Sequence, residues 1–463
     1  MCTALILSYE TSRNFFRSLY TGPPLINRIK LMSKNRFLRN VAIVATGTAG
    51  AQAITMVFSP IITRLYGPEI FGLVGSFIAA LAVLTPMVAL AYPIAIILPE
   101  DDEEAKGLAR LSLLITVTTS VLAVLIISQS SDQLLTLFGL EELNGYLTLI
   151  PLAMLFTGFH QIVEQWVIRK KKFRLSAKAA ITQSLIINFS KAGFGFVYPI
   201  ATPLIILSAF TSFLYAVLLA VGLKLEKGKS KPVEQKNALG LYALAKKYKD
   251  FPIFRAPEVT LNAASQGLPV LMLAAFFGPA AAGFYTLGRT VLAMPSTLLG
   301  KSIGDVFYPR LAEAAHKKED ITLLVIKATK ALALVGLVPF GLIIAFGPWL
   351  FSLAFGSEWN TAGEYARWLS VWCFFGFINT PSVKALPVLN AQFFLLASST
   401  LMLAARAAAL AVGYYVFKSD LLAVIFFSAS GALLNLLLIL ITIHLCKKRK
   451  PGTHSLRSEP SKH

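Results

Sequence analysis

The stretch PLIILSAFTSFLYAVLLAVGL, at residues 203–223, carries no charged side chain. A helix rises about 1.5 Å per residue, so a helix of this length crosses the roughly 30 Å hydrocarbon layer of a bilayer. Similar stretches recur along most of the 463-residue chain, which is 56% hydrophobic and only 14% charged, whereas soluble domains carry roughly 25% charged residues. The composition therefore predicts an all-α polytopic membrane protein.

The apolar stretches predict about twelve transmembrane helices. Glycine, proline and charged residues occupy the short segments between them, as is typical of loops. We expect the spans at 41–63, 71–98, 108–128, 146–167, 179–198, 203–223, 251–277, 281–307, 322–346, 363–388, 393–416 and 421–445.

The loops between these spans differ in charge. One alternate set contains the basic run IRKKKFRLSAK (168–178), the lysine-rich segment 224–249 and the tail KKRK (447–450). The opposite set has only Arg64 and Lys418 as basic residues. Because cytoplasmic loops of membrane proteins are enriched in lysine and arginine, this asymmetry predicts that both termini lie in the cytoplasm. Contact with anionic lipid headgroups is a second use for the same lysines.

The polar segment 224–249 divides the chain into two halves of six spans each. Within it, residues 239–251 have the pattern of a short amphipathic helix at the inner membrane surface. Met32 opens the polar start MSKNRF, so we expect translation to begin there, or residues 1–31 to form a disordered or interfacial leader. The expected divisions are a cytoplasmic leader (1–36), an N-terminal lobe (37–223), a cytoplasmic linker (224–249), a C-terminal lobe (250–446) and a basic cytoplasmic tail (447–463).

Turns in the two halves resemble each other. A Gly-Pro pair followed by a further glycine occurs in both, and the two copies are offset by 211 positions. An even number of spans gives both halves the same orientation, so the repeat predicts two six-helix lobes related by a pseudo-two-fold axis along the membrane normal. The matching residues are Gly67, Pro68 and Gly72 in the first half and Gly278, Pro279 and Gly283 in the second.

Polar residues inside the spans indicate function most strongly, since a buried polar group is costly unless it is paired or hydrated. The first span of each half carries such residues at spacings of three or four, which places them on one helical face bordering a shared interior. The alternative is hydrogen bonding between helices, or a mutual ion pair for Arg255 and Glu258. The residues are Thr48, Gln52, Thr55, Ser59 and Thr63 in span one and Arg255, Glu258, Asn262 and Gln266 in span seven.

Cations outnumber acids inside the predicted spans. Lys191 and Arg406 lie in the fifth span of each half, and Arg289 lies in span eight. Glu164, in span four, is one of few intramembrane acids. An excess of positive charge suits an anionic substrate, above all a phosphate. Glu164 and Glu258 are the candidate proton carriers.

The sequence argues against several other functions. Its net charge of +20 lies in loops and tails rather than in a basic, aromatic-studded module, so nucleic acid is not an expected partner. The three cysteines and five histidines are scattered, and no nucleotide-binding or GxSxG motif is present, so we expect no metal, no cofactor and no enzymatic activity. The acidic run EDDEEA (100–105) is interpreted as a solvated helix start rather than a metal site.

Three segments resemble a known family. They are SPIITRLYGPEIFG (59–72), AIILPEDDEEAKGL (95–108) and the run 248–311, which begins YKDFPIFRAPEVTLN. They are similar to the polysaccharide biosynthesis/export family, which includes Wzx-type O-antigen flippases and belongs to the multidrug/oligosaccharidyl-lipid/polysaccharide exporter superfamily. The resemblance extends over residues 37–445 and implies twelve helices in two six-helix lobes.

The resemblance also implies a function. Such a protein would move an undecaprenyl-diphosphate-linked oligosaccharide (a unit of O-antigen, capsule or exopolysaccharide) across the bacterial inner membrane by alternating access. Polysaccharide polymerase and chain-length machinery are the partners implied. The residues expected to meet the diphosphate and sugar are Arg255, Arg289, Arg406, Lys191, Gln52, Asn262 and Gln266.

The alternative is a cation-coupled exporter of drugs or small molecules from the same superfamily. Such a protein should bury carboxylates facing its cavity. Glu164, Glu258 and Asp305 are available for this but are outnumbered by cations.

Overall fold

The computed structural model describes residues 36–138, 141–225, 240–295, 311, 314, 320–389 and 391–448. This described part is almost entirely helical and contains no strand, which confirms the all-α fold class. Seven of its helical segments are long and apolar enough to cross a membrane by length and composition alone. One of them, Ile43–Val88, has 46 residues and is about twice as long as one span requires.

The N-terminal half contains six membrane-spanning segments among the described residues. Helix α3 supplies two of them because Gly67, with φ 66° and ψ 172°, interrupts its helical backbone. A short helix, α4, and a 3-10 turn, η1, connect other spans. The elements are α3 (Arg36–Val88), α4 (Tyr92–Ala95), α5 (Asp102–Phe138), η1 (Glu141–Tyr146), α6 (Leu149–Arg169), α7 (Phe173–Val197) and α8 (Ala201–Leu225).

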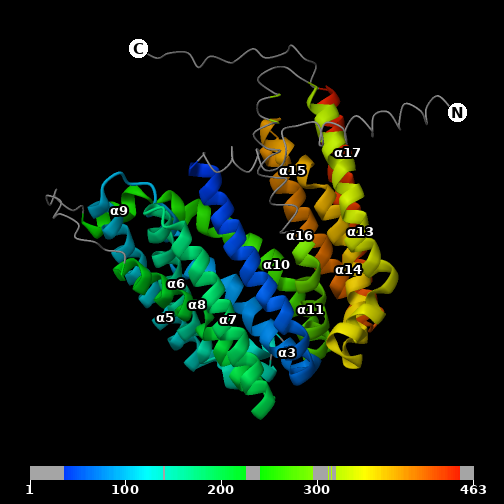
Figure 1. Ribbon diagram of the computed structural model, residues 1–463, viewed down its shortest axis with the longest axis horizontal. Coiled ribbons are helices and arrows are strands. Elements are labelled where there is room, and N and C mark those ends of the chain that lie inside the picture. Colours follow the sequence, from blue (N-terminus) through cyan, green and yellow to red (C-terminus); the bar gives the residue numbers. More distant parts are fainter. Residues whose placement is uncertain are drawn as a thin grey trace.

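The C-terminal half contributes six further spans in the described part, with α14 and α15 forming one of them. In Figure 1 the two halves lie side by side, with α3, α10 and α11 between them. This arrangement confirms about twelve spans in two six-helix lobes. The elements are α9 (Leu241–Lys247), η2 (Phe251–Arg255), α10 (Ala256–Phe277), α11 (Pro279–Pro295), α13 (Ile321–Phe355), η4 (Ser357–Trp359), α14 (Asn360–Ile378), α15 (Thr380–Val388), α16 (Gln392–Tyr415) and α17 (Asp420–Lys448).

Each half packs around its own apolar core. Phe77 and Leu204 are fully buried in the N-terminal half, and Tyr285, Phe340 and Tyr365 are fully buried in the C-terminal half. Burying one large apolar side chain stabilises a fold by about 1.5–3 kcal/mol in water. Inside a bilayer the lipid tails are equally apolar, so close packing and hydrogen bonds decide how the helices associate.

The repeated Gly-Pro turns have the same backbone shape in both halves. Gly67 has φ 66° and ψ 172°, and Gly278 has φ 85° and ψ 174°. Both lie at positive φ, where a side chain would be strained and glycine is favoured. The sequence repeat is therefore also a structural repeat.

The two halves touch where these turns lie against each other. A Cβ atom added at Gly72 would lie 1.6 Å from the carbonyl oxygen of Pro279, and one added at Gly283 would lie 2.1 Å from that of Pro68. Each turn thus packs against its counterpart, as a two-fold relation between similar surfaces requires. We call this contact between residues 67–75 and 278–286 the seam.

A loop of the C-terminal half covers one end of the seam. Trp359 is 1% exposed, and its indole Nε1 donates a 3.1 Å hydrogen bond to the carbonyl of Thr63. Its ring meets Phe71 edge-on with 5.3 Å between centroids. Nearby, Arg64 donates a 2.8 Å hydrogen bond to the carbonyl of Leu353. The seam is therefore closed by backbone-directed hydrogen bonds as well as by glycine contacts.

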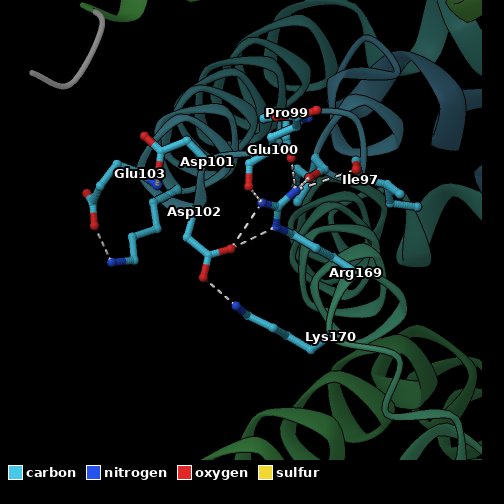
Figure 2. A network of polar contacts seen from close by, with 10 residues as sticks. Ile97, Pro99, Glu100, Asp101, Asp102, Glu103, Arg169 and Lys170 are labelled. Atoms are coloured by element: carbon cyan, nitrogen blue, oxygen red, sulfur yellow. Dashed lines mark hydrogen bonds and ion pairs between the residues drawn. The ribbon is translucent and has the colours of Figure 1, made fainter. Parts of the chain in front are cut away.

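The opposite end of the N-terminal half is held by the acidic run 100–105. Arg169 donates hydrogen bonds to the carbonyls of Ile96 and Glu100, at 3.1 and 3.2 Å, and to the carboxylate of Asp102, at 3.0 Å. Figure 2 shows the Arg169 side chain pointing towards Glu100 and Asp102. Lys170 pairs with the same carboxylate. The acidic run thus binds neighbouring basic side chains, and the basic run 168–178 has a packing role besides its charge.

Helix α9 docks on the same end. Leu244 is fully buried, Tyr92 donates a 3.1 Å hydrogen bond to the carbonyl of Ala245, and Lys247 pairs with Glu104. The hydrogen bond to Glu104 raises the pKa of the Lys247 ammonium. The segment that follows the first six spans is therefore anchored to α5.

Replacing Gly283 with alanine tests the seam. The new Cβ meets the backbone of Pro68, which cannot rotate away, so we expect Gly283→Ala to destabilise the protein by at least about 2 kcal/mol. The thermal unfolding midpoint of the purified protein in detergent measures this. Gly341→Ala is the control because no atom lies within 4 Å of its Cβ position. Equal midpoints for the two variants would contradict the packing described.

Candidate functional site

A large cavity lies between the two halves. Its volume is about 1200 Å³, and its walls come from α3, α6, α7 and α8 of the N-terminal half and α10 and α11 of the C-terminal half. We call it the central cavity. Several hundred Å³ is the usual size for a small-molecule site, so the central cavity has room for a larger group such as an oligosaccharide.

Most of the polar face predicted for span one borders the central cavity. Thr48, Gln52, Thr55 and Ser59 are among its lining residues. Thr63 is not; it is buried and donates a 2.9 Å hydrogen bond to the carbonyl of Ser59. The polar face extends beyond the cavity, because helical periodicity shows which side of a helix is polar but not how far along the helix the cavity reaches.

Helix α7 adds a hydrogen-bonded cluster to this wall. Asn188 donates a 3.2 Å hydrogen bond to the hydroxyl of Thr55, and the hydroxyls of Thr55 and Ser184 lie 3.2 Å apart. All three residues line the central cavity. The sequence left two alternatives for these polar side chains, namely hydrogen bonds between helices and a polar cavity wall. The same side chains do both.

Lys191 is the cation of the N-terminal wall. It lies one turn beyond Asn188 on α7 and lines the central cavity. Its backbone carbonyl accepts a 2.9 Å hydrogen bond from the buried Tyr66 hydroxyl, which fixes this turn of the helix. Among the described residues, no carboxylate forms an ion pair with its ammonium group.

The C-terminal wall carries a chain of amides that ends on an arginine. Gln266 donates a 2.9 Å hydrogen bond to the Oδ1 atom of Asn262. Arg289 donates from Nη2 to the Oε1 atom of Gln266 at 2.7 Å, and from Nη1 to the Gln266 carbonyl at 2.5 Å. These bonds orient the guanidinium of Arg289 without neutralising its charge, and all three side chains line the central cavity.

Glu164 is the one acid among the described residues that line the central cavity. Its carboxylate lies 3.5 Å from Nε2 of His160, one turn earlier on α6. The His160 ring meets the Tyr215 ring edge-on at 4.8 Å, and both residues also line the cavity. His160 was not predicted as a site residue, because the five histidines are scattered along the sequence. Its spacing of four from Glu164 was the available signal.

Arg406 lies in a second, smaller cavity within the C-terminal half. This cavity has a volume of about 360 Å³ and is lined by residues of α11, α14, α15, α16 and α17. Arg289 lines both cavities. The guanidinium carbon of Arg406 lies 4.4 Å from the centre of the Trp372 ring and 5.5 Å from that of Phe427. We call this space the C-half cavity.

Two predicted residues lie apart from both cavities. Arg255 and Glu258 pair with each other at 2.6 Å, and their side chains are 48% and 62% exposed. Neither lines a cavity, so the mutual pair is the arrangement found. Asp305 lies outside the described residues. Within the described chain, no three His, Cys, Asp or Glu side chains gather as a metal site.

The structure thus assembles most of the predicted site. The residues that share the central cavity are Gln52, Glu164, Lys191, Asn262, Gln266 and Arg289. Lys191 and Arg289 lie on walls from different halves, and Glu164 is the single acid among the described lining residues. The cavity can therefore hold an anionic group, and it offers amides for hydrogen bonds to hydroxyl groups.

Several solved structures have a similar fold. The lipid II flippase MurJ in an inward closed conformation matches with a TM-score of 0.68 and 12% identity, over 87% of each chain. An inward-facing multidrug resistance MATE family transporter of the MOP superfamily matches with a TM-score of 0.60 and 13% identity, over 88% of this chain and 96% of the other. A MOP superfamily transporter from Pyrococcus furiosus matches with a TM-score of 0.55 and 13% identity, over the same shares.

Sequence comparison defines the family. No curated protein sequence matches the chain. The family model described as polysaccharide biosynthesis protein matches residues 61–364, a range that includes Lys191, Arg289 and the seam. Because this match covers more than half of the sequence, the chain belongs to the polysaccharide biosynthesis protein family.

Proposed function

We propose that the protein is a flippase that moves an undecaprenyl-diphosphate-linked oligosaccharide, a unit of O-antigen, capsule or exopolysaccharide, across the bacterial inner membrane. The observation that carries this proposal is the central cavity, which has Lys191 on one half and Arg289 on the other. A diphosphate placed between them would contact both halves at once. Membership of the polysaccharide biosynthesis family and the fold shared with a lipid II flippase support the same substrate class.

The two cations suit a diphosphate in different ways. Arg289 is held in place by Gln266, so little side-chain entropy is lost when it binds an anion. Lys191 forms no ion pair with a described residue, so its charge is available. Gln52 and Asn262 line the same cavity and offer amide donors and acceptors for sugar hydroxyls. The lipid tail stays in the bilayer, where it is already well solvated.

Alternating access follows from the seam. With both termini in the cytoplasm, as the loop charges favour, the Gly67 and Gly278 turns lie at the external face. The seam then closes the external end while the cavity lies on the cytoplasmic side of it. Rigid rotation of one half against the other would open the seam and close the cytoplasmic end. The flipped unit would pass to a polysaccharide polymerase and its chain-length machinery.

A cation-coupled exporter of drugs or small molecules is the second candidate. The observation in its favour is the His160–Glu164 pair in the central cavity, since a carboxylate can bind either a cation or a proton. In the flippase the same pair would couple transport to a proton gradient. The cations Lys191 and Arg289 favour the flippase, because they repel cationic drugs.

Neutral substitutions in the cavity test the flippase. We expect Lys191→Ala and Arg289→Ala each to slow flipping by about tenfold or more, because each loses a charge-assisted hydrogen bond worth roughly 1.5–3 kcal/mol. The measurement is the rate at which a diphosphate-linked oligosaccharide lipid in proteoliposomes becomes accessible to a sugar-modifying enzyme outside the vesicle. Lys327→Ala and Arg367→Ala are matched controls, because neither residue lines the central cavity or the smaller cavity around Arg406. Unchanged rates in both cavity variants would contradict the proposal.

Glutamine substitutions at Glu164 and Glu258 test which glutamate couples flipping to a proton gradient. We expect Glu164→Gln to remove the stimulation of flipping by a pH gradient, since a glutamine cannot carry the proton. Glu258→Gln should keep this stimulation, because Glu258 lies outside the cavity and pairs with Arg255. Flipping rates with and without a gradient across the proteoliposome membrane are compared. Full stimulation in Glu164→Gln would exclude Glu164 as the coupling group.

A further inference from the structure

The C-half cavity holds positive charge without a matching acid. Arg289 and Arg406 both line it, and none of its described lining residues is a glutamate or aspartate. Two guanidinium groups beside one cavity repel each other, and the repulsion is strongest away from water. A negative ion between the two charges would remove this repulsion.

Arg406 is buried with at least one N–H group that has no hydrogen-bond acceptor. It is only 9% exposed, and its Nε atom is buried without an acceptor. Among the described residues it makes no ion pair, and its contacts are with the Trp372 and Phe427 rings. Ring faces attract a guanidinium, but they are not oxygen acceptors for its five N–H groups. A buried cation without an acceptor is costly.

Two neutral polar residues of the cavity already donate to backbone carbonyls. Thr380 donates its hydroxyl to the carbonyl of Phe377 at 2.8 Å, and Asn435 donates its amide to the carbonyl of Gly431 at 2.7 Å. Both Nη atoms of Arg289 bind Gln266. The donors that remain belong mainly to Arg406.

We propose that the C-half cavity binds a small monovalent inorganic anion of the halide class between Arg406 and Arg289. A phosphate or diphosphate needs many donors around its oxygens, whereas this cavity offers few. Its other walls are apolar, from Leu292, Phe377 and the Trp372 ring, and a weakly hydrated anion tolerates such walls. The bound anion would neutralise Arg406 and leave Arg289 oriented towards the central cavity. The site shares Arg289 with the proposed diphosphate site, but Arg406 is its main donor, and anion binding there does not depend on the transported lipid.

Chloride is the probe for this site. The purified full-length protein is melted in sodium gluconate and in sodium chloride at the same ionic strength. We expect chloride to raise the unfolding midpoint by about 2–4 °C at saturation. Lys191→Ala should show the same rise, because Lys191 does not line the C-half cavity. Arg406→Gln should show none, while the control Arg367→Gln keeps it.

Bromide provides a second readout on the unaltered protein, in case Arg406→Gln does not fold. Crystals soaked in sodium bromide should give an anomalous peak between the Arg406 and Arg289 side chains. Equal midpoints in gluconate and chloride, or the absence of a peak in this cavity, would overturn the proposal. Stabilisation through Arg406 by pyrophosphate but not by chloride would also overturn it and assign the cavity to the diphosphate. If Lys191→Ala no longer flips the lipid but keeps the chloride effect, the flippase proposal is supported and the halide proposal also stands.

Discussion

The reciprocal approach of two glycine-containing turns determines how the halves are arranged. Gly72 and Gly283 lie so close to the opposing backbone that a Cβ atom does not fit at either position. Small residues are what allow helices to approach closely in a bilayer, where apolar side chains gain little from leaving lipid. The central cavity lies between the same two halves, and it includes residues of the seam, such as Gly75 and Thr286, in its wall.

The same contact explains why the cavity has one wall from each half. Helices α3, α10 and α11 lead away from the seam and present their polar faces to each other. Lys191 and Arg289 therefore lie on different halves of the protein. An anion bound by both would favour the arrangement in which the two cations are close, and its release would remove that preference.

Sequence patterns predicted the features that depend on the length of apolar segments and on helical periodicity. Apolar stretches gave the spans, the 211-residue offset gave the repeat, and spacings of three and four gave the cavity faces of α3 and α10. Depth was not predictable: Asn262 and Gln266 line the cavity, while Arg255 and Glu258, on the same stripe, lie beyond it. The C-half cavity was also missed, because Trp372, Arg406 and Asn435 come together from three helices by tertiary packing. The domain boundaries and the cytoplasmic termini stay predictions.

A structure of the protein bound to an undecaprenyl-diphosphate-linked oligosaccharide tests the central claim most directly. The account predicts that the phosphates lie within hydrogen-bonding distance of Lys191 Nζ and the Arg289 guanidinium, with the sugar in the central cavity. Phosphates bound only at the basic run 168–178, with the central cavity holding no part of the lipid headgroup, would contradict it.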